Sequence, residues 1–447
     1  MKKMNKIILS IVACSLIVST SVFATPDSAL LGTSTKMART TAFMPTSSHR
    51  LAMGSAGLGL AGYYDSYLYN PANITKDGFK IVMPSLTLTV NNIYNLMDQP
   101  EGEDVISIIE NLGNDDNAPI DLATLILEAI PSGNGEIMTW DTNFGFKTRG
   151  FGLDFAVQEK VRSYNGGGDF TTASAISETT IAATAALGFN IPLGEYFSID
   201  LGAKGAFNYK LYSIAMDANQ ALNLVSTMGD DGDITDTLME TLPFASGFAI
   251  PVTVGVNLNL PLGLSVSAVG RNFNGNYNMV GYTSLKSLIN NDETIVAFAG
   301  EDTFEDTVGF TDTDPLDSDS FVAEIPWGFD LGIAFSPSTP LDGLLKPSIA
   351  LDFIDCYSLL EDAINGTITP TQLKSDALAA LNIGAQVRLL SILDVRAGLS
   401  QGYKSVGVGL DLLVLHLDAA YYWKEFGTVL GQNPSDALSV KFSLLSR

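Results

Sequence analysis

The sequence predicts an all-β protein, a transmembrane antiparallel β-barrel of about 14 strands with an N-terminal segment inside its lumen. Residues 248–260 show why, because apolar side chains stand at every second position with small or uncharged polar residues between them. A β-strand sends successive side chains to opposite faces, so this segment has one apolar and one polar face. Hydrophobic residues make up 46% of the chain, yet after residue 24 no uninterrupted apolar run approaches the roughly 18 residues that suggest a spanning helix. A closed barrel satisfies every backbone group in lipid without helices.

The first 24 residues have the organisation of a secretory signal peptide. Three lysines and an apolar run over residues 7–23 lead to a small-residue cleavage pattern that ends at Ala24. Removal of this segment takes away the three lysines and no acid, so the formal net charge falls from −25 to −28. An uncleaved anchor and a lipoprotein cleavage site at Cys14 are the alternatives. If cleavage follows Ala24, Cys356 is the only cysteine left, which excludes an intramolecular disulfide and a cysteine-based zinc site.

Fifteen alternating runs are candidate strands, and we expect fourteen of them to form the barrel because single-chain bacterial barrels normally have an even number of strands. The run at 276–284 is the doubtful one. Pro251 interrupts the run at 248–260, where it removes one ladder hydrogen bond. Within that run Val254 should face lipid and Asn257 the lumen, so arginine should be costly at the first position and tolerated at the second. The runs lie near 79–90, 137–148, 149–158, 179–190, 197–212, 246–260, 263–273, 276–284, 325–335, 347–355, 379–390, 392–400, 404–413, 414–424 and 437–445.

Long insertions separate some of these runs, and we expect them to be external loops, because outer-membrane barrels pair short periplasmic turns with long external loops. Residues 291–320 contain ten Asp or Glu and no Lys or Arg. The carboxylates at 312–319 suit calcium but lack EF-hand spacing, so we expect a solvated acidic surface and no metal. So acidic an exterior argues against nucleic acid as a partner. The insertions lie at about 91–136, 213–245, 274–324 and 356–378, with short helical patterns at 105–112, 120–130, 221–228 and 357–364.

The densest motif is residues 51–74, which read L-A-M-G-S-A-G-L-G-L-A-G-Y-Y-D-S-Y-L-Y-N-P-A-N-I. Its glycines permit close backbone approach and positive φ, while Asn70-Pro71 favours a turn. A flexible linker is the alternative, but a solvated linker rarely carries four tyrosines in seven positions. The segment is therefore predicted to be compact, not a strand, and placed inside the lumen.

In Met53-Gly54, Ala56-Gly57, Asp65 and Asn70-Pro71-Ala72, the chain resembles the FadL/TodX family of outer-membrane transporters for long-chain fatty acids and other hydrophobic compounds. The resemblance implies an N-terminal hatch that plugs a fourteen-stranded barrel, with Asn-Pro-Ala as its signature. Related hatch-containing barrels, including the TraF-like group and the PorV-type shuttle proteins, carry a similar motif without transporting lipid. The motif thus indicates architecture more strongly than substrate.

This resemblance divides the chain into three expected parts. They are a signal peptide over 1–24, a hatch over 25–78 and an outer-membrane barrel over 79–447. Hatch or ligand-gating roles fall by the same resemblance on Gly54, Gly57, Asp65, Asn70, Pro71 and Ala72.

A second group of candidate residues lies on the lumen face of the alternating strands. A lysine or arginine there could meet a carboxylate head group, and ordinary charge pairing within the lumen is the alternative. The lumen candidates are Asp200, Lys204, Asn208, Gln386 and Arg388.

Catalysis has little support in the sequence. The chain has two histidines, His49 and His416, and no nucleophile elbow, H-E-x-x-H pair or P-loop. We expect neither an enzyme nor a cofactor.

The expected function is passive uptake of hydrophobic or amphipathic small molecules, such as long-chain fatty acids, across the outer membrane. The expected partners are outer-membrane lipid and a hydrophobic small-molecule ligand. The alternative is a structural or interaction barrel that displays its loops or acts as a scaffold for an exported protein partner.

Overall fold

A computed structural model gives the architecture of the chain. The expected signal peptide, the helical patterns at 105–112, 120–130 and 221–228, and the carboxylates at 312–319 lie outside the described residues. The structure describes residues 43–76, 78–94, 133–165, 173–213, 216–217, 244–282, 287–288, 292, 294, 320–338, 340–365, 369–427 and 430–445.

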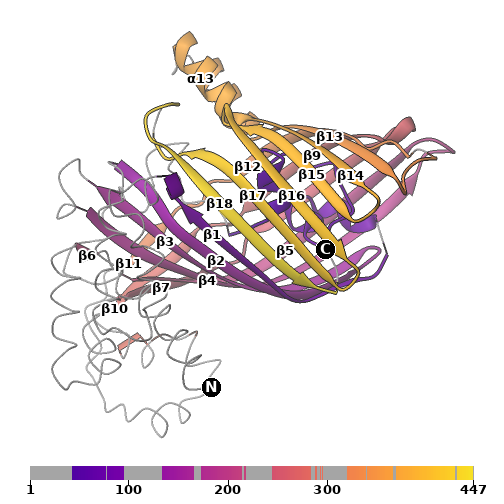
Figure 1. Cartoon of the computed structure of the whole chain (residues 1–447). Helices are drawn as coiled ribbons and strands as arrows, with labels where there is room; N and C mark the ends of the chain where they lie inside the picture. The colour runs from indigo at the N-terminus through magenta and orange to yellow at the C-terminus, as the bar shows by residue number, and fades with distance from the viewer. Residues whose placement is uncertain are drawn as a thin grey trace, which may run out of the picture.

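The described strands form one closed antiparallel sheet (Figure 1). β1 pairs with β18 on one side and with β2 on the other, so the first and last strands meet and the barrel has no open edge. The strands are β1 (Lys80–Asn91), β2 (Gly133–Thr148), β3 (Phe151–Asn165), β4 (Ala173–Pro192), β5 (Ser198–Ser213), β6 (Met216–Asp217), β7 (Phe244–Ala249), β8 (Val252–Asn259), β9 (Leu264–Phe273), β10 (Tyr277–Tyr282), β11 (Ser320–Ala323), β12 (Gly328–Phe335), β13 (Leu345–Phe353), β14 (Leu381–Leu389), β15 (Leu393–Ser400), β16 (Tyr403–Leu412), β17 (Leu415–Glu425) and β18 (Pro434–Leu444).

These strands make fourteen crossings of the barrel wall, because three crossings are each divided into two strands. β7 and β8 both pair with β5, while β10 pairs with β7 as β9 pairs with β8. β11 pairs with β10 and β12 pairs with β9, so β11 and β12 also belong to one crossing. β6 is a two-residue strand that pairs with β4. The predicted count is confirmed. The doubtful run at 276–284 is the continuation of the preceding run and not a separate crossing.

Pro251 stands at the break between β7 and β8. Its carbonyl still accepts a hydrogen bond from the Ala206 N–H at 3.1 Å, although its own nitrogen has no hydrogen to donate. The partner register continues across the break, from Asn208 opposite Ala249 to Gly205 opposite Val252. The proline therefore interrupts the hydrogen-bond ladder without ending the crossing.

The two faces of the wall differ as the alternation predicts. Along β8, exposed and buried residues alternate, and Val254 is 43% exposed while Asn257 is fully buried. The outward faces of the other strands carry a belt of exposed Leu, Ile, Val and Phe side chains. Because an apolar band around a closed barrel is what lipid contact requires, this is a membrane-spanning barrel.

The ends of the barrel also differ. Two-residue to nine-residue connections join β2 to β3, β4 to β5, β8 to β9, β12 to β13, β14 to β15 and β16 to β17 at one end. The long insertions leave from strand ends at the other, which we call the loop end. There the expected helix at 357–364 is confirmed as α12 (Cys356–Asn365), and α13 (Pro370–Ala380) projects beside it (Figure 1). No helix among the described residues combines the length and apolar composition of a membrane span.

The N-terminal segment lies inside the barrel, where Figure 1 shows its helices in indigo within the ring of strands. It folds into α2 (Ser48–Ala52), α3 (Ser66–Tyr69) and the 3-10 helix η1 (Pro71–Thr75). Met53, Ala56, Tyr67, Leu68 and Ile74 are almost completely buried. We call residues 43–76 the hatch, and this packing rules out the linker alternative for them.

Candidate functional site

Asn70 both folds the hatch and ties it to the wall. Its side-chain oxygen accepts a hydrogen bond from the Ala72 N–H at 3.0 Å and so caps η1, in which Pro71 takes the first position. Its amide nitrogen donates to the Leu58 carbonyl at 2.9 Å and to Asn257 Oδ1 on β8 at 2.7 Å. The Asn70-Pro71-Ala72 tripeptide is thus a buried joint between two parts of the hatch and one strand.

Asn257 completes this joint from the barrel side. Its nitrogen donates to Asn73 Oδ1 at 2.8 Å, and its oxygen also accepts from the Ser267 hydroxyl at 2.7 Å. The expectation that arginine is tolerated at position 257 is wrong, because the lumen at this level is filled by the hatch. An arginine would have to displace Asn70 and Asn73.

Glycines let the hatch and the wall approach each other closely. A Cβ at Gly202 of β5 would overlap the Pro71 backbone, and one at Gly255 of β8 would overlap the Asn70 side chain. On the hatch side Gly54 has φ 62°, a conformation that favours glycine, and a Cβ there would overlap the Leu399 backbone. Its N–H donates to Ser405 Oγ at 2.9 Å.

Asp65 holds the hatch through a buried ion pair. Its Oδ2 lies 3.0 Å from Lys441 Nζ on β18, and His49 Nε2 lies 3.8 Å from Oδ1. Both acid and lysine are more than nine-tenths buried, so the pairing compensates for the desolvation of two charges. Burial alone would raise the pKa of Asp65, but Lys441 and His49 hold it well below its usual range.

His49 lies within the hatch and not on a membrane-spanning strand. Its ring stacks on Tyr63 with centroids 3.8 Å apart, and its Nδ1 is 2.9 Å from Ser47 Oγ. Burial lowers the pKa of His49 to about 4, although Asp65 opposes this shift. His49 is therefore neutral at pH 7, and its interactions are with other residues of the hatch and of the barrel wall.

Asp352 of β13 binds the glycine-rich turn of the hatch. Its Oδ2 accepts from the Gly57 N–H at 2.6 Å and from the Leu58 N–H at 3.0 Å. The Arg50 guanidinium lies 3.9 Å from the same oxygen. Gly57 has φ 127°, which a residue with a side chain rarely adopts, so the turn that presents these N–H groups depends on it.

Three predicted lumen residues contact the hatch directly, and Asp200 is one of them, because its Oδ2 lies 3.8 Å from Lys76 Nζ. The Lys204 ammonium donates to the Leu68 carbonyl. Gln386 Oε1 accepts from the Tyr63 hydroxyl at 2.7 Å and from Arg396 Nε at 2.9 Å. These contacts hold the hatch from opposite parts of the wall.

Arg388 and Asp200 have side-chain partners on the wall itself. Arg388 lies 3.0 Å from Asp394 and 3.1 Å from Asp411. Asp200 accepts from the amides of Asn190 and Asn259, each at 2.6 Å. Asn208 is buried on β5 opposite Ala249, away from the hatch contacts. The candidates therefore do not meet at one site.

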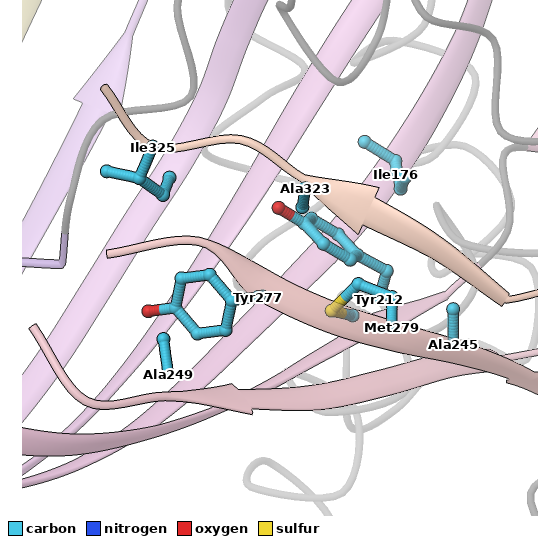
Figure 2. Packing of buried hydrophobic residues seen from close by; sticks show 8 residues of the cluster. All are labelled: Ile176, Tyr212, Ala245, Ala249, Tyr277, Met279, Ala323 and Ile325. Atoms are coloured by element: carbon cyan, nitrogen blue, oxygen red, sulfur yellow. The ribbon is translucent and has the colours of Figure 1, made fainter. Parts of the chain in front are cut away.

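An apolar cluster lines the inner wall toward the loop end (Figure 2). Tyr212 and Tyr277 supply its aromatic rings, and Lys210 Nζ lies 5.4 and 5.0 Å from their centroids. Lys210 also forms a buried ion pair with Glu178. The cluster comprises Ile176, Tyr212, Ala245, Ala249, Tyr277, Met279, Ala323 and Ile325.

A cavity of about 290 Å³ lies between the hatch and the opposite part of the wall. Hatch residues Met44, Leu51 and Tyr69 form its apolar side, together with Tyr422 and Trp423 of β17. Its charged lining residues are three cations and one acid, although the whole chain has a net charge of −25. These charged residues are Arg50, Glu136, Lys160 and Lys424.

Two of the three cations of this cavity, Arg50 and Lys424, are held in place by neighbouring groups. Arg50 lies over the Tyr69 ring, 4.0 Å from its centroid, and donates to the Ser55 carbonyl at 2.7 Å. Lys424 pairs with Glu136 at 3.0 Å. Positioned cations beside apolar side chains can take a molecule with an anionic head and an apolar body. Within the described residues, no group of three or more His, Cys, Asp or Glu side chains could hold a metal ion.

Sequence reasoning placed Asn257 on the lumen face but missed its contact with the hatch. It also missed three other wall residues that bind the hatch, which are Lys441, Asp352 and Arg396, the last by donating from Nη2 to the Tyr63 hydroxyl at 3.0 Å. A signal for the first was present, because Lys441 stands between outward Val440 and partly buried Phe442 in an alternating strand. A charged residue on the inner face of such a strand must find a partner. Nothing in the sequence says that the partner is Asp65.

No family model matches the chain. No curated protein matches it either. Among solved structures, it is similar to the CymD monoaromatic hydrocarbon channel, with 11% sequence identity, a TM-score of 0.41 and coverage of 89% of this chain and 96% of that one. It is similar to the toluene transporter TodX of Pseudomonas putida, with 10% identity, a TM-score of 0.38 and coverage of 90% and 98%.

A FadL homologue of Pseudomonas aeruginosa gives 9% identity, a TM-score of 0.41 and coverage of 91% and 99%. The barrel architecture itself follows from the strand pairings of this chain.

Proposed function

We propose that this protein is an outer-membrane transporter for passive uptake of hydrophobic or amphipathic small molecules, such as long-chain fatty acids. The observation that carries the proposal is the cavity of about 290 Å³ beside the hatch, which combines aromatic side chains with an excess of cations. Its volume is near the lower end of the roughly 300 to 1,000 Å³ of small-molecule sites. It accommodates a head group and the adjoining part of a chain.

The charges of the cavity suit a carboxylate. Arg50, Lys160 and Lys424 line it together with a single acid, Glu136, which already pairs with Lys424. A carboxylate that enters would compete for these cations, while its alkyl chain would lie against Tyr69 and Trp423. Each charge-assisted hydrogen bond would contribute about 1.5–3 kcal/mol.

Passage toward the other end of the barrel requires the hatch to move. In the proposed organisation, residues 1–24 are the signal peptide, 25–78 the hatch and 79–447 the barrel. Hydrogen bonds from Gly57, Asn70 and Tyr63 seat the hatch on four different strands. Gly54, Asp65, Pro71 and Ala72 belong to the same seat. Such bonds can be exchanged for water or ligand without unfolding the wall, so the movement needs no energy source and no catalytic step.

Ligand binding tests the head-group assignment. The affinity of the purified protein for oleate and for methyl oleate is measured with Lys160→Gln and Lys424→Gln, and with Lys374→Gln on exposed α13 as the matched control. We expect each cavity variant to lose about tenfold in oleate affinity, or about 1.4 kcal/mol, with methyl oleate almost unaffected. Equal affinity of the unaltered protein for acid and ester would overturn carboxylate recognition.

Mass spectrometry of the molecules that copurify in mild detergent tests the substrate class. We expect fatty acids or similar amphiphiles. Copurification of one exported protein, without any such molecule, would favour a scaffold role. No contact among the described residues favours that alternative at present.

A further inference from the structure

α12 carries more apolar surface than the described part of the chain covers. Cys356 and Leu359, three residues apart, are buried against the barrel, while Tyr357, Leu360 and Ile364 are 46%, 60% and 81% exposed. Spacings of three and four residues place the exposed three on one face, because an α-helix has 3.6 residues per turn. Glu361 and Asn365 are exposed beside that face and give the helix a polar side. An apolar stripe flanked by polar residues is typical of a helix at a membrane interface.

The first residues of α12 are fixed to the barrel wall. The apolar stripe of Tyr357, Leu360 and Ile364 therefore has a fixed orientation relative to the barrel. Arg271 of β9 bridges Asp330 at 2.8 Å and Asp355 at 2.6 Å, and Asp355 is the residue before the helix. The Asp355 N–H also donates to Asp330 Oδ1 at 2.9 Å. The Ile354 N–H donates to the Ala380 carbonyl at 2.9 Å, which closes the α12–α13 segment onto the wall.

The stripe continues the lipid-facing belt of the barrel. Tyr357 packs on outward Trp327, with ring centroids 4.5 Å apart, and Trp327 stacks on outward Phe273 at 6.1 Å. Trp and Tyr are enriched where a membrane protein crosses from hydrocarbon to water. Below Trp327, the outward side chains of β12 are Phe329, Leu331, Ile333 and Phe335.

The lengths of the adjoining strands place α12 at that boundary. β12 has eight residues and β13 nine, close to the roughly 9 to 11 residues of a tilted transmembrane strand. The lipid-facing part of β12 therefore ends near Gly328, beyond which its crossing continues as β11, and that of β13 ends near Phe353. α12 begins three residues after Phe353, at the level where the hydrocarbon ends.

We propose that α12 is an interfacial helix that lies on the lipid surface beside the barrel, with Tyr357, Leu360 and Ile364 inserted at the boundary between head groups and acyl chains. The occupant of the stripe is the membrane that already contacts Trp327 and Phe273. The helix would fix the height of this side of the barrel in the bilayer and anchor one loop. This role is independent of the transported molecule.

Spin-label accessibility tests the proposal in phosphatidylcholine vesicles. Leu360→Cys, Ile364→Cys and the control Asn365→Cys are made in a Cys356→Ala background and labelled with a nitroxide. Ile364 and Asn365 are neighbours on the same turn but on different faces. We expect collisions with oxygen to exceed those with a water-soluble nickel chelate several-fold more at 360 and 364 than at 365.

Two results would overturn the proposal. Nickel access at 360 and 364 equal to that at 365 would place the stripe in water, and low access to both reagents would show that a protein surface, such as a second copy, covers it. If Cys356→Ala impairs folding, Leu360→Trp and Asn365→Trp in the unaltered chain replace the labels. Brominated lipid should then quench added fluorescence at 360 and not at 365, and equal quenching would contradict the proposal.

Discussion

The lumen contains two regions that differ in how their inner walls are used. At the level of the hatch, inward side chains such as Asn257, Asp352 and Lys441 bind a hatch residue directly. Toward the loop end, β7, β10 and β11 present an apolar cluster around Tyr277 instead. A barrel of one alternating pattern thus binds the hatch through polar side chains at one level and presents an apolar surface at another.

The boundary between the two regions coincides with breaks in three neighbouring crossings. Asparagine side chains replace missing ladder bonds there, since Asn274 donates to the Ile250 carbonyl at 3.2 Å and Asn276 accepts from the Ile325 N–H at 2.9 Å. Pro251 lies at the same level. Whether an inward-facing side chain is polar therefore depends on what fills the lumen at that level, and not on strand alternation alone.

The largest expected effect is at the ion pair beneath the hatch. Lys441→Met leaves the Asp65 carboxylate buried without its cation, which should cost about 3–5 kcal/mol of hatch stability. Lys424→Met is the matched control, because its pair with Glu136 is partly exposed and should cost about 1 kcal/mol or less. Hydrogen exchange of hatch amides measures both. Similar protection of the hatch amides from exchange in the two variants would contradict the assignment of the Asp65–Lys441 pair as an anchor of the hatch.

Packing between the hatch and β5 gives the next effect. Gly202→Val places a side chain where the Pro71 backbone lies, and it should destabilise the seated hatch by about 3 kcal/mol. Gly205→Val adds the same group to the same strand where a Cβ meets nothing within 4 Å. Limited proteolysis should cleave the hatch in the first variant alone. Equal resistance would show that the two surfaces are not in close contact.

Acid should loosen the hatch through His49. Its pKa is lowered from 6.5 to about 4, so the stability it contributes is complete above pH 6.5 and is lost as pH falls toward 4. The loss should reach roughly 3 kcal/mol. His49→Phe keeps a ring on Tyr63 and removes the titrating group. The protection factors of its hatch amides, which are corrected for the intrinsic pH dependence of exchange, should therefore change less between pH 7.5 and 4.5 than those of the unaltered protein. An unchanged pH dependence would exclude His49 as the source.

The smallest effect compares one residue type in the two regions. Asn257→Ala removes bonds to Asn70 and Asn73 and should cost about 2–3 kcal/mol. Asn208→Ala, at the edge of the apolar cluster, should cost about 1 kcal/mol or less because its Oδ1 accepts no hydrogen bond within the described structure. Denaturant unfolding in detergent compares the two. A larger loss of unfolding free energy in Asn208→Ala than in Asn257→Ala would contradict the conclusion that polar side chains bind the hatch at the level of Asn257 and not at the level of Asn208.

Strand alternation predicted the closed barrel and its strand number, because the two faces of each crossing meet different solvents. The motif at 51–74 predicted a compact segment in the lumen. Individual contacts could not be predicted, since Asp65 and Lys441 are 376 residues apart in the chain. The cavity joins side chains from the hatch and six strands, so no local pattern contains it. The error at Asn257 came from treating the lumen as open water.

A reversible lock on the hatch tests most directly whether transport requires it to move. The hydroxyls of Ser48 on α2 and Ser439 on β18 are 2.9 Å apart, so Ser48→Cys and Ser439→Cys place two thiols within reach of a disulfide. The pair is made in a Cys356→Ala background, with each single cysteine as a control. Oleate uptake into vesicles should stop when the pair is oxidised and return on reduction. Uptake at the same rate with the disulfide closed would contradict passage by movement of the hatch.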